Sequence, residues 1–308
     1  GWEADVHLIL QWARLQPRII YEQTILRDGL DGFKILVLPA CDVLPSSVVA
    51  KIKEFQSKGG LIVGDENLCP AITPDLRITS YRRTGKAQED KASLQKIAED
   101  LREQLQNLYV RRFDSSSPDL VVRVRQYGRA TYVFVVNDRR TFGDYVGHHG
   151  LVMEKGLPVE GDLSLTRQSG TVYDLVEHRR VDARSEGSVL AWDAELGPGD
   201  GRVFMVTDDM IEKVKVDVPQ ETRRGGRASI TVQVLGNNGQ PIAAVVPVQV
   251  IVTDSQGREA EPSGYYGAKD GVLRVDLDLA PNDAAGTWQV RARELASGQE
   301  ATGEMIVQ

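Results

Sequence analysis

A cysteine lies where an α/β enzyme could carry its nucleophile. Cys41 follows the apolar run at residues 35–38, and Asp42 comes directly after it. A thiol just past a buried strand can serve as the nucleophile of a hydrolase or amidase when a neighbouring base activates it. The first question that the sequence raises is whether Cys41 has that role.

The residues around Cys41 do not favour the sharp strand-to-helix turn that exposes such nucleophiles. That turn has small residues on both sides, as in G-x-C-x-G or G-x-S-x-G, whereas this sequence has Pro39 and Val43 there. The histidine of this region is His7, between apolar positions of the first predicted helix. The helix after Cys41 is expected to begin about five residues later, too far for its dipole to activate the thiol. We interpret Cys41 as a small, half-buried thiol and keep a Cys41-dependent hydrolase as the alternative.

Three carboxylates follow two of the predicted strands. Asp42 comes after the first strand, and Asp65 and Glu66 come after the strand at residues 61–63. Ligands of open α/β sheets bind at the carboxyl ends of the strands, where paired carboxylates can transfer protons or hold a divalent cation. We favour a structural interpretation, in which Asp42 caps a helix and Asp65 forms an Asx-turn. The three residues remain candidate ligand-binding residues.

The sequence predicts no cofactor and no metal site. It has neither the G-x-G-x-x-G pattern nor a P-loop, so a nucleotide site lacks support. Cys41 and Cys69 do not have metal-ligand spacing, and we expect no disulfide between them. His148 and His149 are adjacent, so on a strand they would point to opposite faces and not chelate one metal easily. We expect them in a glycine-flanked loop.

Several aromatic residues could form a platform that stacks on sugars. Tyr265 and Tyr266 lie between two glycines, so we expect an exposed loop and treat both as candidate ligand-binding residues. For Trp192 and Trp288 we favour a role in the core or on a sheet face.

The elements that must position Cys41 and the carboxylates alternate between helix and strand. Apolar spacing predicts helices at residues 5–15 and 86–108, and a continuous apolar strand of the parallel-sheet type at residues 33–38. A helix with a serine N-cap follows Pro45, and the Gly59-Gly60 pair ends it. With the strand at residues 61–63, these elements form a right-handed βαβ unit.

The character of the chain changes near Phe113, where alternating strands replace the helices. We expect an α/β domain at residues 1–112, a β-sandwich at residues 113–208 and a second β-sandwich at residues 209–308. The fold class is therefore multidomain, with one α/β domain followed by two all-β sandwich domains.

Composition excludes some partners. The chain of 308 residues has a formal net charge of −7, which argues against a nucleic-acid partner. No run approaches the ~18 apolar residues that a membrane-spanning helix needs. The sequence begins inside an amphipathic pattern, so we expect a part of a longer protein.

The stretch at residues 19–66 resembles a known kind of domain. It is similar to the domain that follows the catalytic barrel in bacterial β-galactosidases of the trimerising kind and in related multidomain glycoside hydrolases, and the likeness extends over roughly residues 3–80. The residues that carry it are Asp31, Gly32, Phe33, Lys34, Leu36, Val37, Leu38, Pro39, Gly59, Gly60, Ile62 and Val63. The resemblance implies a flavodoxin-like fold, similar to class I glutamine amidotransferases, in a family whose members usually lack the amidotransferase triad.

The two later regions also resemble parts of carbohydrate enzymes. ATYVFVVND, TVYDLVEHRRV and ELGPGDGRVFMV, within residues 130–206, are similar to the β-sandwich that closes many glycosidase chains. GQPIAAVVPVQVIVTDSQG and NDAAGTWQVRARELASGQEA resemble immunoglobulin-like modules of bacterial macroglobulin and carbohydrate-enzyme proteins.

The resemblance implies an accessory role, because the catalysis of that family depends on a (β/α)8 barrel with two glutamates, and this chain has no room for one. No catalytic residue can be carried over. We expect a non-catalytic region of a larger glycoside-hydrolase-like protein that supports domain packing or oligomerisation. Its expected partner is a missing N-terminal domain or a neighbouring subunit, with carbohydrate as a further candidate. A carbohydrate-binding module in the last domain is another alternative. The sequence assigns no compartment, although action of the parent protein on polysaccharide would imply a secreted or periplasmic one.

Overall fold

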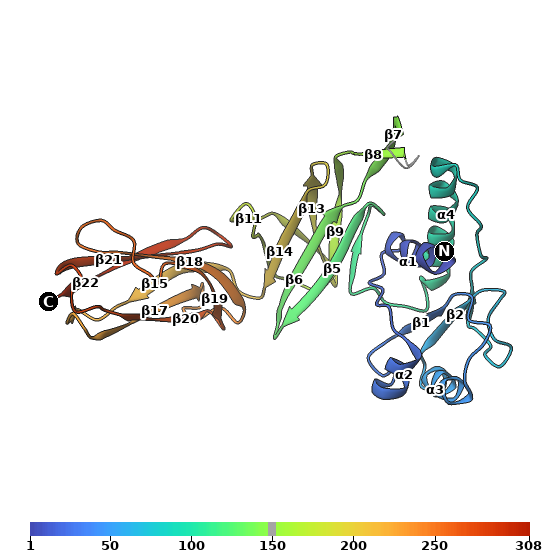
Figure 1. Ribbon diagram of the computed structural model, residues 1–308, viewed down its shortest axis with the longest axis horizontal. Coiled ribbons are helices and arrows are strands. Elements are labelled where there is room, and N and C mark those ends of the chain that lie inside the picture. Colours follow the sequence, from blue (N-terminus) through green and yellow to red (C-terminus); the bar gives the residue numbers. More distant parts are fainter. Residues whose placement is uncertain (147–151) are drawn as a thin grey trace. The chain divides into compact units, whose positions relative to one another are not determined.

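The computed structural model describes residues 1–146 and 152–308, and the side chains of residues 142–153 are not described. The chain forms two compact units. The N-terminal unit comprises Gly1–Val122, Asn137–Val159 and Gly197–Gly199, and the C-terminal unit comprises Arg123–Val136, Glu160–Leu196 and Asp200–Gln308. The described residues form four helices, all in the N-terminal unit, and several β-sheets, so the fold is rich in β-structure (Figure 1).

A small parallel sheet organises the N-terminal unit. It contains β1 (Ile35–Leu38), β2 (Leu61–Gly64) and β3 (Leu76–Arg77) in the order β1-β2-β3. Val37 pairs with Val63, and Val63 pairs in turn with Leu76. Because the three strands run in the same direction, their carboxyl ends meet at one edge of the sheet.

Helices cover both faces of this sheet (Figure 1). On one face α1 (Trp2–Trp12) and α4 (Ala87–Leu105) pack on Val37 and Val63, and on the other face α2 (Glu22–Asp28) and α3 (Ser46–Ser57) pack on Leu36 and Ile62. Successive strand residues point to opposite faces, so two fully apolar strands require a helix layer on each side. The predicted α/β layering is thus present, with three strands in its sheet.

Some predicted local features differ from the structure. The first helix, α1, begins at Trp2 rather than at residue 5. The predicted serine cap of α3 is wrong, because Ser46 is already helical and Pro45 occupies the N-cap without a side-chain hydrogen bond. Asp42 does not cap this helix either, since it lies three residues before Pro45. Gly59 has φ 91°, which agrees with its predicted place just past the helix end.

The rest of the N-terminal unit consists of β-structure beside α4. β4 (Phe113–Ser115) follows α4, and β7 (Arg140–Val146) pairs antiparallel with β8 (Val152–Gly156). The ammonium group of Lys91 on α4 donates to the carbonyl oxygen of Arg140 at 3.3 Å and lies 3.8 Å from the Asp119 carboxylate. The contact of Lys91 with Arg140 joins β7 to α4.

Two sheets form the middle region of the chain. The first has the order β11-β10-β14-β6-β5, and the second places β13 between β12 and β9. The bounds are β5 (Leu120–Tyr127), β6 (Ala130–Asn137), β9 (Val159–Thr166), β10 (Thr171–Asp174), β11 (Arg179–Val181), β12 (Ala183–Glu186), β13 (Val189–Leu196) and β14 (Gly201–Thr207). Trp192 of β13 and Phe204 of β14 meet edge to face, with ring centroids 5.7 Å apart, so the two sheets pack face to face.

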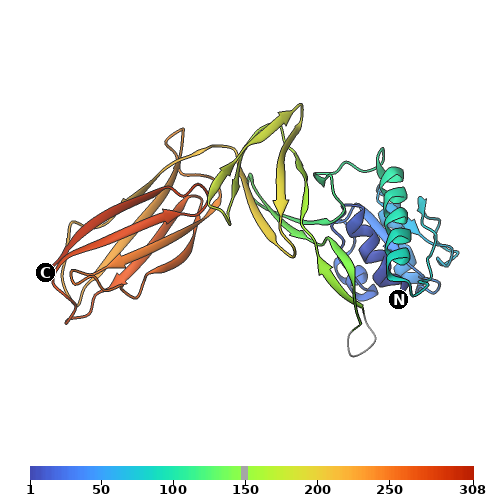
Figure 2. The ribbon, with the colours of Figure 1, turned by 90° about the horizontal axis from the view of Figure 1, so that it is seen from above.

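The last hundred residues form a β-sandwich (Figure 2). Its apolar core is continuous. Its strands follow the order β15-β17-β20-β19-β18-β21-β22-β16. The bounds are β15 (Ile211–Asp217), β16 (Glu221–Thr222), β17 (Arg227–Gly236), β18 (Val245–Thr253), β19 (Gly264–Lys269), β20 (Val272–Asp278), β21 (Gly286–Glu294) and β22 (Glu300–Val307). Buried and more exposed residues alternate along β18 and β21, as strict polar–apolar alternation predicts.

Within the C-terminal unit, two tyrosine hydroxyls join the middle strands to the last sandwich. The Tyr132 hydroxyl donates to the carbonyl oxygen of Val245 at 2.7 Å and accepts from its N–H at 2.8 Å. The Tyr173 hydroxyl accepts from the N–H of Ile211 at 2.7 Å. The predicted boundary at residues 208–209 falls between β14 and β15. The division into three domains stays a prediction.

Candidate functional site

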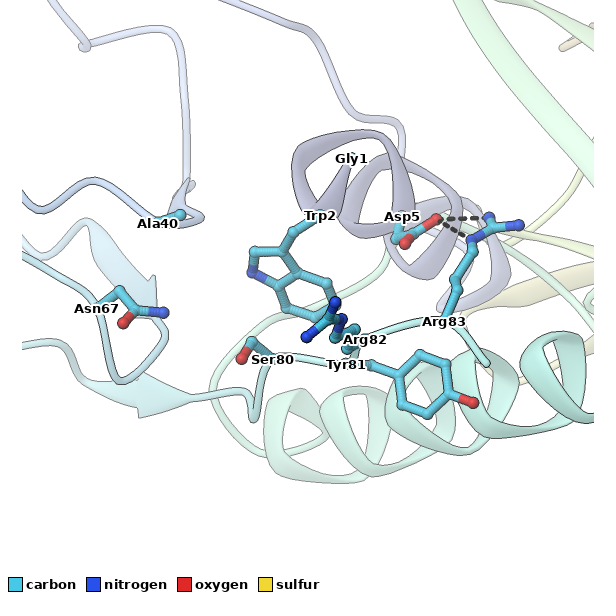
Figure 3. Close-up of a pocket in the computed structure, with 9 residues that line it drawn as sticks. All are labelled: Gly1, Trp2, Asp5, Ala40, Asn67, Ser80, Tyr81, Arg82 and Arg83. Atoms are coloured by element: carbon cyan, nitrogen blue, oxygen red, sulfur yellow. Dashed lines mark hydrogen bonds and ion pairs between the residues drawn. The ribbon is translucent and has the colours of Figure 1, made fainter. Parts of the chain in front are cut away.

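A pocket of about 470 Å³ lies at the carboxyl ends of the parallel strands (Figure 3). We call it the sheet-edge pocket. Its lining comes from α1 and from the segments that follow β1, β2 and β3, namely Gly1, Trp2, Asp5, Ala40, Asn67, Ser80, Tyr81, Arg82 and Arg83. This is where open α/β sheets bind ligands, because the loops that leave adjacent strands diverge there.

The buried carboxylate of Asp65 joins three of these segments. Oδ2 accepts the indole N–H of Trp2 and the backbone N–H of Ala40, both at 2.7 Å, and Oδ1 accepts the backbone N–H of Asn67 at 2.9 Å. The bond to Asn67 is the Asx-turn that the sequence predicts. Ala40 has φ 48°, a left-handed conformation that is uncommon for alanine, and its bond to Asp65 holds it there. Asp65 therefore has a structural task that engages both oxygens.

The other two candidate carboxylates lie apart from the pocket lining. Glu66 accepts from the backbone N–H of Ser80 at 3.2 Å and from its hydroxyl group. The Ser80 hydroxyl lowers the pKa of the Glu66 carboxyl, with the backbone N–H groups adding to the effect. Asp42 is exposed. The structure thus uses Glu66 to tie the segment after β3 to the turn after β2, and it does not bring Asp42 to that place.

The thiol of Cys41 is half-buried and packs against the core between the sheet and α2 and α3. Sγ donates to the carbonyl oxygen of Pro39 at 3.4 Å. Burial raises the pKa of the thiol, and the negative charge of Asp65 raises it further. A higher pKa leaves less thiolate at neutral pH, so this environment disfavours a nucleophilic role. Cys41 and Cys69 are both free, and the N–H of Cys69 donates to the carbonyl oxygen of Cys41 at 2.8 Å.

The segment after β3 is held by two buried aspartates. Asp5 of α1 accepts from Nε of Arg83 at 2.9 Å, and this hydrogen bond raises the pKa of the arginine. Asp90 of α4 accepts from the Thr84 N–H and from the Tyr81 hydroxyl, each at 2.8 Å. The Thr84 N–H is the main cause of the lowered pKa of Asp90. Both carboxylates fix the backbone from which the pocket residues project.

Sequence reasoning missed Trp2, Asn67 and the residues at 80–83. The carboxyl-end rule points to the residues after each strand, but β3 contains two residues, too few to show any apolar pattern. Trp2 lies 63 residues from Asp65 in the sequence, so only the folded chain shows their hydrogen bond.

The aromatic candidates of the C-terminal unit lie in different environments. Tyr265 is 74% exposed, whereas Tyr266 is half-buried and its hydroxyl donates to the carbonyl oxygen of Pro262 at 2.6 Å. Both belong to β19, so the predicted loop is wrong, because this glycine-flanked segment pairs with β18. Trp192 and Trp288 are buried in their cores.

Two further findings concern metals and membranes. His148 and His149 lie outside the described residues. In the part of the chain that the structure describes, no group of three or more histidine, cysteine, aspartate or glutamate side chains is arranged to hold a metal ion. None of the helices described here is long and apolar enough to cross a membrane.

No family model matches the sequence, and no curated protein matches it. The solved structures that resemble it include two glycoside hydrolases. For α-L-fucosidase isoenzyme 2 from Paenibacillus thiaminolyticus, identity is 10%, the match covers 68% of this chain and 45% of that chain, and the TM-score is 0.49. For a catalytic mutant of a GH42 β-galactosidase from G. stearothermophilus, identity is 12% and the TM-score is 0.40. That match covers 66% of this chain and 35% of the β-galactosidase chain. The chain therefore spans less than half the length of either enzyme.

A structural role for Asp65 predicts a stability loss when its charge is removed. Asp65→Asn turns an amide NH2 group toward N–H donors, and an unsatisfied buried group costs about 1–3 kcal/mol, more where a charge is involved. We expect the free energy of unfolding of the N-terminal unit to fall by about 2–3 kcal/mol. Urea unfolding followed by far-UV circular dichroism measures this, since the described helices lie in that unit. Asp42→Asn is the control, with a change within about 0.5 kcal/mol. Equal stability of both variants would contradict the structural role.

The raised pKa of Cys41 predicts slow thiol labelling. In a Cys69→Ser variant, Cys41 is the remaining cysteine. We expect it to react with a chromogenic disulfide reagent at pH 7 more slowly than free cysteine does, because less thiolate is present. The rate should keep rising with pH beyond about 8.5, where free cysteine titrates. In urea the rate should return to that of an unfolded chain. Rapid labelling of the folded protein that levels off below neutral pH would indicate an activated nucleophile instead.

Proposed function

We propose that this chain is a non-catalytic accessory region of a larger glycoside-hydrolase-like protein, where it supports domain packing or oligomerisation. The observation that carries the proposal is the state of the groups at the carboxyl edge of the parallel sheet. Asp65 is engaged by N–H donors on both oxygens, and the thiol of Cys41 has a raised pKa. The contacts of Asp65 and the environment of Cys41 therefore favour a structural role for both residues over a role as acid, base or nucleophile.

The fold assignment that accompanies this proposal is a flavodoxin-like domain, similar to class I glutamine amidotransferases, followed by two sandwiches. The parallel strands between two helix layers support it. The sequence resemblance at residues 19–66 supports the link to glycoside hydrolases of the trimerising kind.

Exposed apolar side chains on the N-terminal unit support a partner domain or subunit. Four large ones lie in the segments around α2 and after β1: Ile19 at 66% exposure, Tyr21 at 69%, Leu26 at 47% and Val43 at 79%. Where such side chains gather into a patch, they are typical of protein–protein contacts. The proposed partner is the N-terminal domain of the same protein or a neighbouring subunit.

The proposal predicts that the chain does not turn over glycosides, esters or amides. We expect its rates on chromogenic 4-nitrophenyl substrates of these three kinds to equal the rates in buffer alone. Turnover that disappears in Cys41→Ser would overturn the proposal in favour of the hydrolase alternative. Turnover that survives Cys41→Ser would overturn both. The coding sequence upstream of residue 1 provides an independent check, since the proposal expects a barrel with paired glutamates there.

A second candidate function is carbohydrate binding by the last sandwich, and the placement of Tyr265 favours it. Gln249 pairs across the sheet with Tyr265 on one side and Arg293 on the other, and Arg293 pairs with Glu300. The amide of Gln249 donates to the Tyr265 hydroxyl at 3.3 Å. An aromatic ring beside amide, guanidinium and carboxylate groups on an outer sheet face offers both stacking and hydrogen bonds to a sugar.

This second candidate predicts binding on a glycan array that depends on Tyr265. We expect Tyr265→Ala to weaken binding of any glycan retained on the array by about tenfold or more, or ~1.4 kcal/mol. Tyr21→Ala, which also removes an exposed tyrosine but lies in the N-terminal unit, should leave binding unchanged. An array without any bound glycan, or equal losses in both variants, would exclude the module.

A further inference from the structure

We propose that the sheet-edge pocket binds a small sugar acid, whose ring lies against Trp2 and whose carboxylate pairs with Arg82. This goes beyond the accessory role, because it gives the N-terminal unit a ligand of its own. A volume of about 470 Å³ falls within the range of about 300–1,000 Å³ that small-molecule pockets span.

The indole of Trp2 is positioned as a platform. Its N–H is donated to the buried carboxylate of Asp65 at 2.7 Å, which fixes the orientation of the ring. The N–H is therefore engaged, and the indole lines the pocket with its apolar surface (Figure 3). A rigid aromatic surface of this kind suits the C–H face of a sugar ring and binds it with little loss of side-chain entropy.

The charges of the lining favour an anion. Asp5, Arg82 and Arg83 are its charged side chains, and Asp5 pairs with Arg83 (Figure 3). Arg82 is exposed, and among the residues whose side chains the structure describes its guanidinium has no hydrogen bond or ion pair. One positive charge is thus left over at the pocket. A guanidinium binds a carboxylate through two parallel hydrogen bonds, which fixes the direction of the ligand as well as its charge.

Two of the acidic groups near this edge are already engaged. Asp65 accepts from N–H donors on both oxygens, and Glu66 accepts from both donors of Ser80. Both carboxylates accept hydrogen bonds from within the chain and do not pair with Arg82. The guanidinium of Arg82 is therefore available to the carboxylate of a ligand.

The pocket that Trp2 lines also has a polar side chain, that of Asn67. Asn67 lines the pocket, and its backbone N–H, not its side-chain amide, is the group that donates to Asp65. The amide can therefore serve sugar hydroxyls as both donor and acceptor. The Tyr81 hydroxyl is donated to Asp90, so Tyr81 contributes its ring. Aromatic surface, one amide and one free guanidinium together match a monosaccharide that carries a carboxylate.

The test is a titration of the full chain with D-glucuronate and D-galacturonate, measured by calorimetry and by ligand-observed NMR. D-glucose, D-galactose and acetate are the comparison ligands. We expect at least one uronate to bind saturably and to bind about tenfold or more tightly than its neutral sugar and than acetate. Neutral sugars that bind equally well would overturn the role of the carboxylate, and acetate that binds equally well would overturn the role of the ring. No saturable binding of either uronate would overturn the site.

Matched arginine variants locate the site. We expect Arg82→Gln to weaken uronate binding by about tenfold or more. Arg18→Gln makes the same change at an exposed arginine that does not line the pocket, and it should leave binding unchanged. Equal effects of the two variants would show a general charge effect and overturn the assignment. Circular dichroism confirms that both variants are folded. Failure here would leave the accessory role intact, because that role is tested by turnover and not by uronate binding.

Discussion

The candidate site depends on the hydrogen bonds that the buried carboxylate of Asp65 accepts. A carboxylate without solvent is costly unless hydrogen bonds replace its hydration. Here the indole of Trp2 and the backbone N–H groups of Ala40 and Asn67 replace it. Because these donors come from α1 and from the segments after β1 and β2, one side chain fixes the relative positions of three elements. The sheet-edge pocket has its shape as a result.

The same constraint commits groups at this edge to contacts within the protein. Both oxygens of Asp65 accept hydrogen bonds from the protein's own N–H groups. Cys41 lies in a half-buried environment among carboxylates, which raises its pKa. The groups left facing the pocket are aromatic surface, an amide and a guanidinium. Such groups can orient a ligand and give it a charge preference.

The C-terminal unit depends on a different principle. Its last sandwich has a core built from alternate residues of many strands, so its stability is spread over a large apolar area. Polar contacts have a positioning role there, as the hydroxyls of Tyr132 and Tyr173 show by pairing with backbone groups of Val245 and Ile211. Tyr265 stands out because its ring is exposed on a strand whose inward residues belong to the core.

The sequence by itself determined the features that depend on local pattern. The stripe of α4, the apolar strands β1 and β2 and the alternation in β18 follow from spacing, because a periodic apolar face must be buried. The sequence also predicted a half-buried thiol at Cys41, since Pro39 and Val43 do not fit the sharp turn that exposes a nucleophile. The Asx-turn of Asp65 was also predictable, because its hydrogen bond joins residues only two positions apart.

Only the tertiary structure decided which groups meet at the sheet edge. Trp2 and Asp65 are 63 residues apart, and β3 is two residues long, so no sequence pattern places residues 80–83 beside α1. The left-handed conformation of Ala40 was equally invisible, and so was the strand that carries Tyr265, although the sequence did predict the exposure of this tyrosine. The physical reason is that periodicity reports which face of an element is buried, whereas a pocket depends on distances between elements that the parallel sheet brings together.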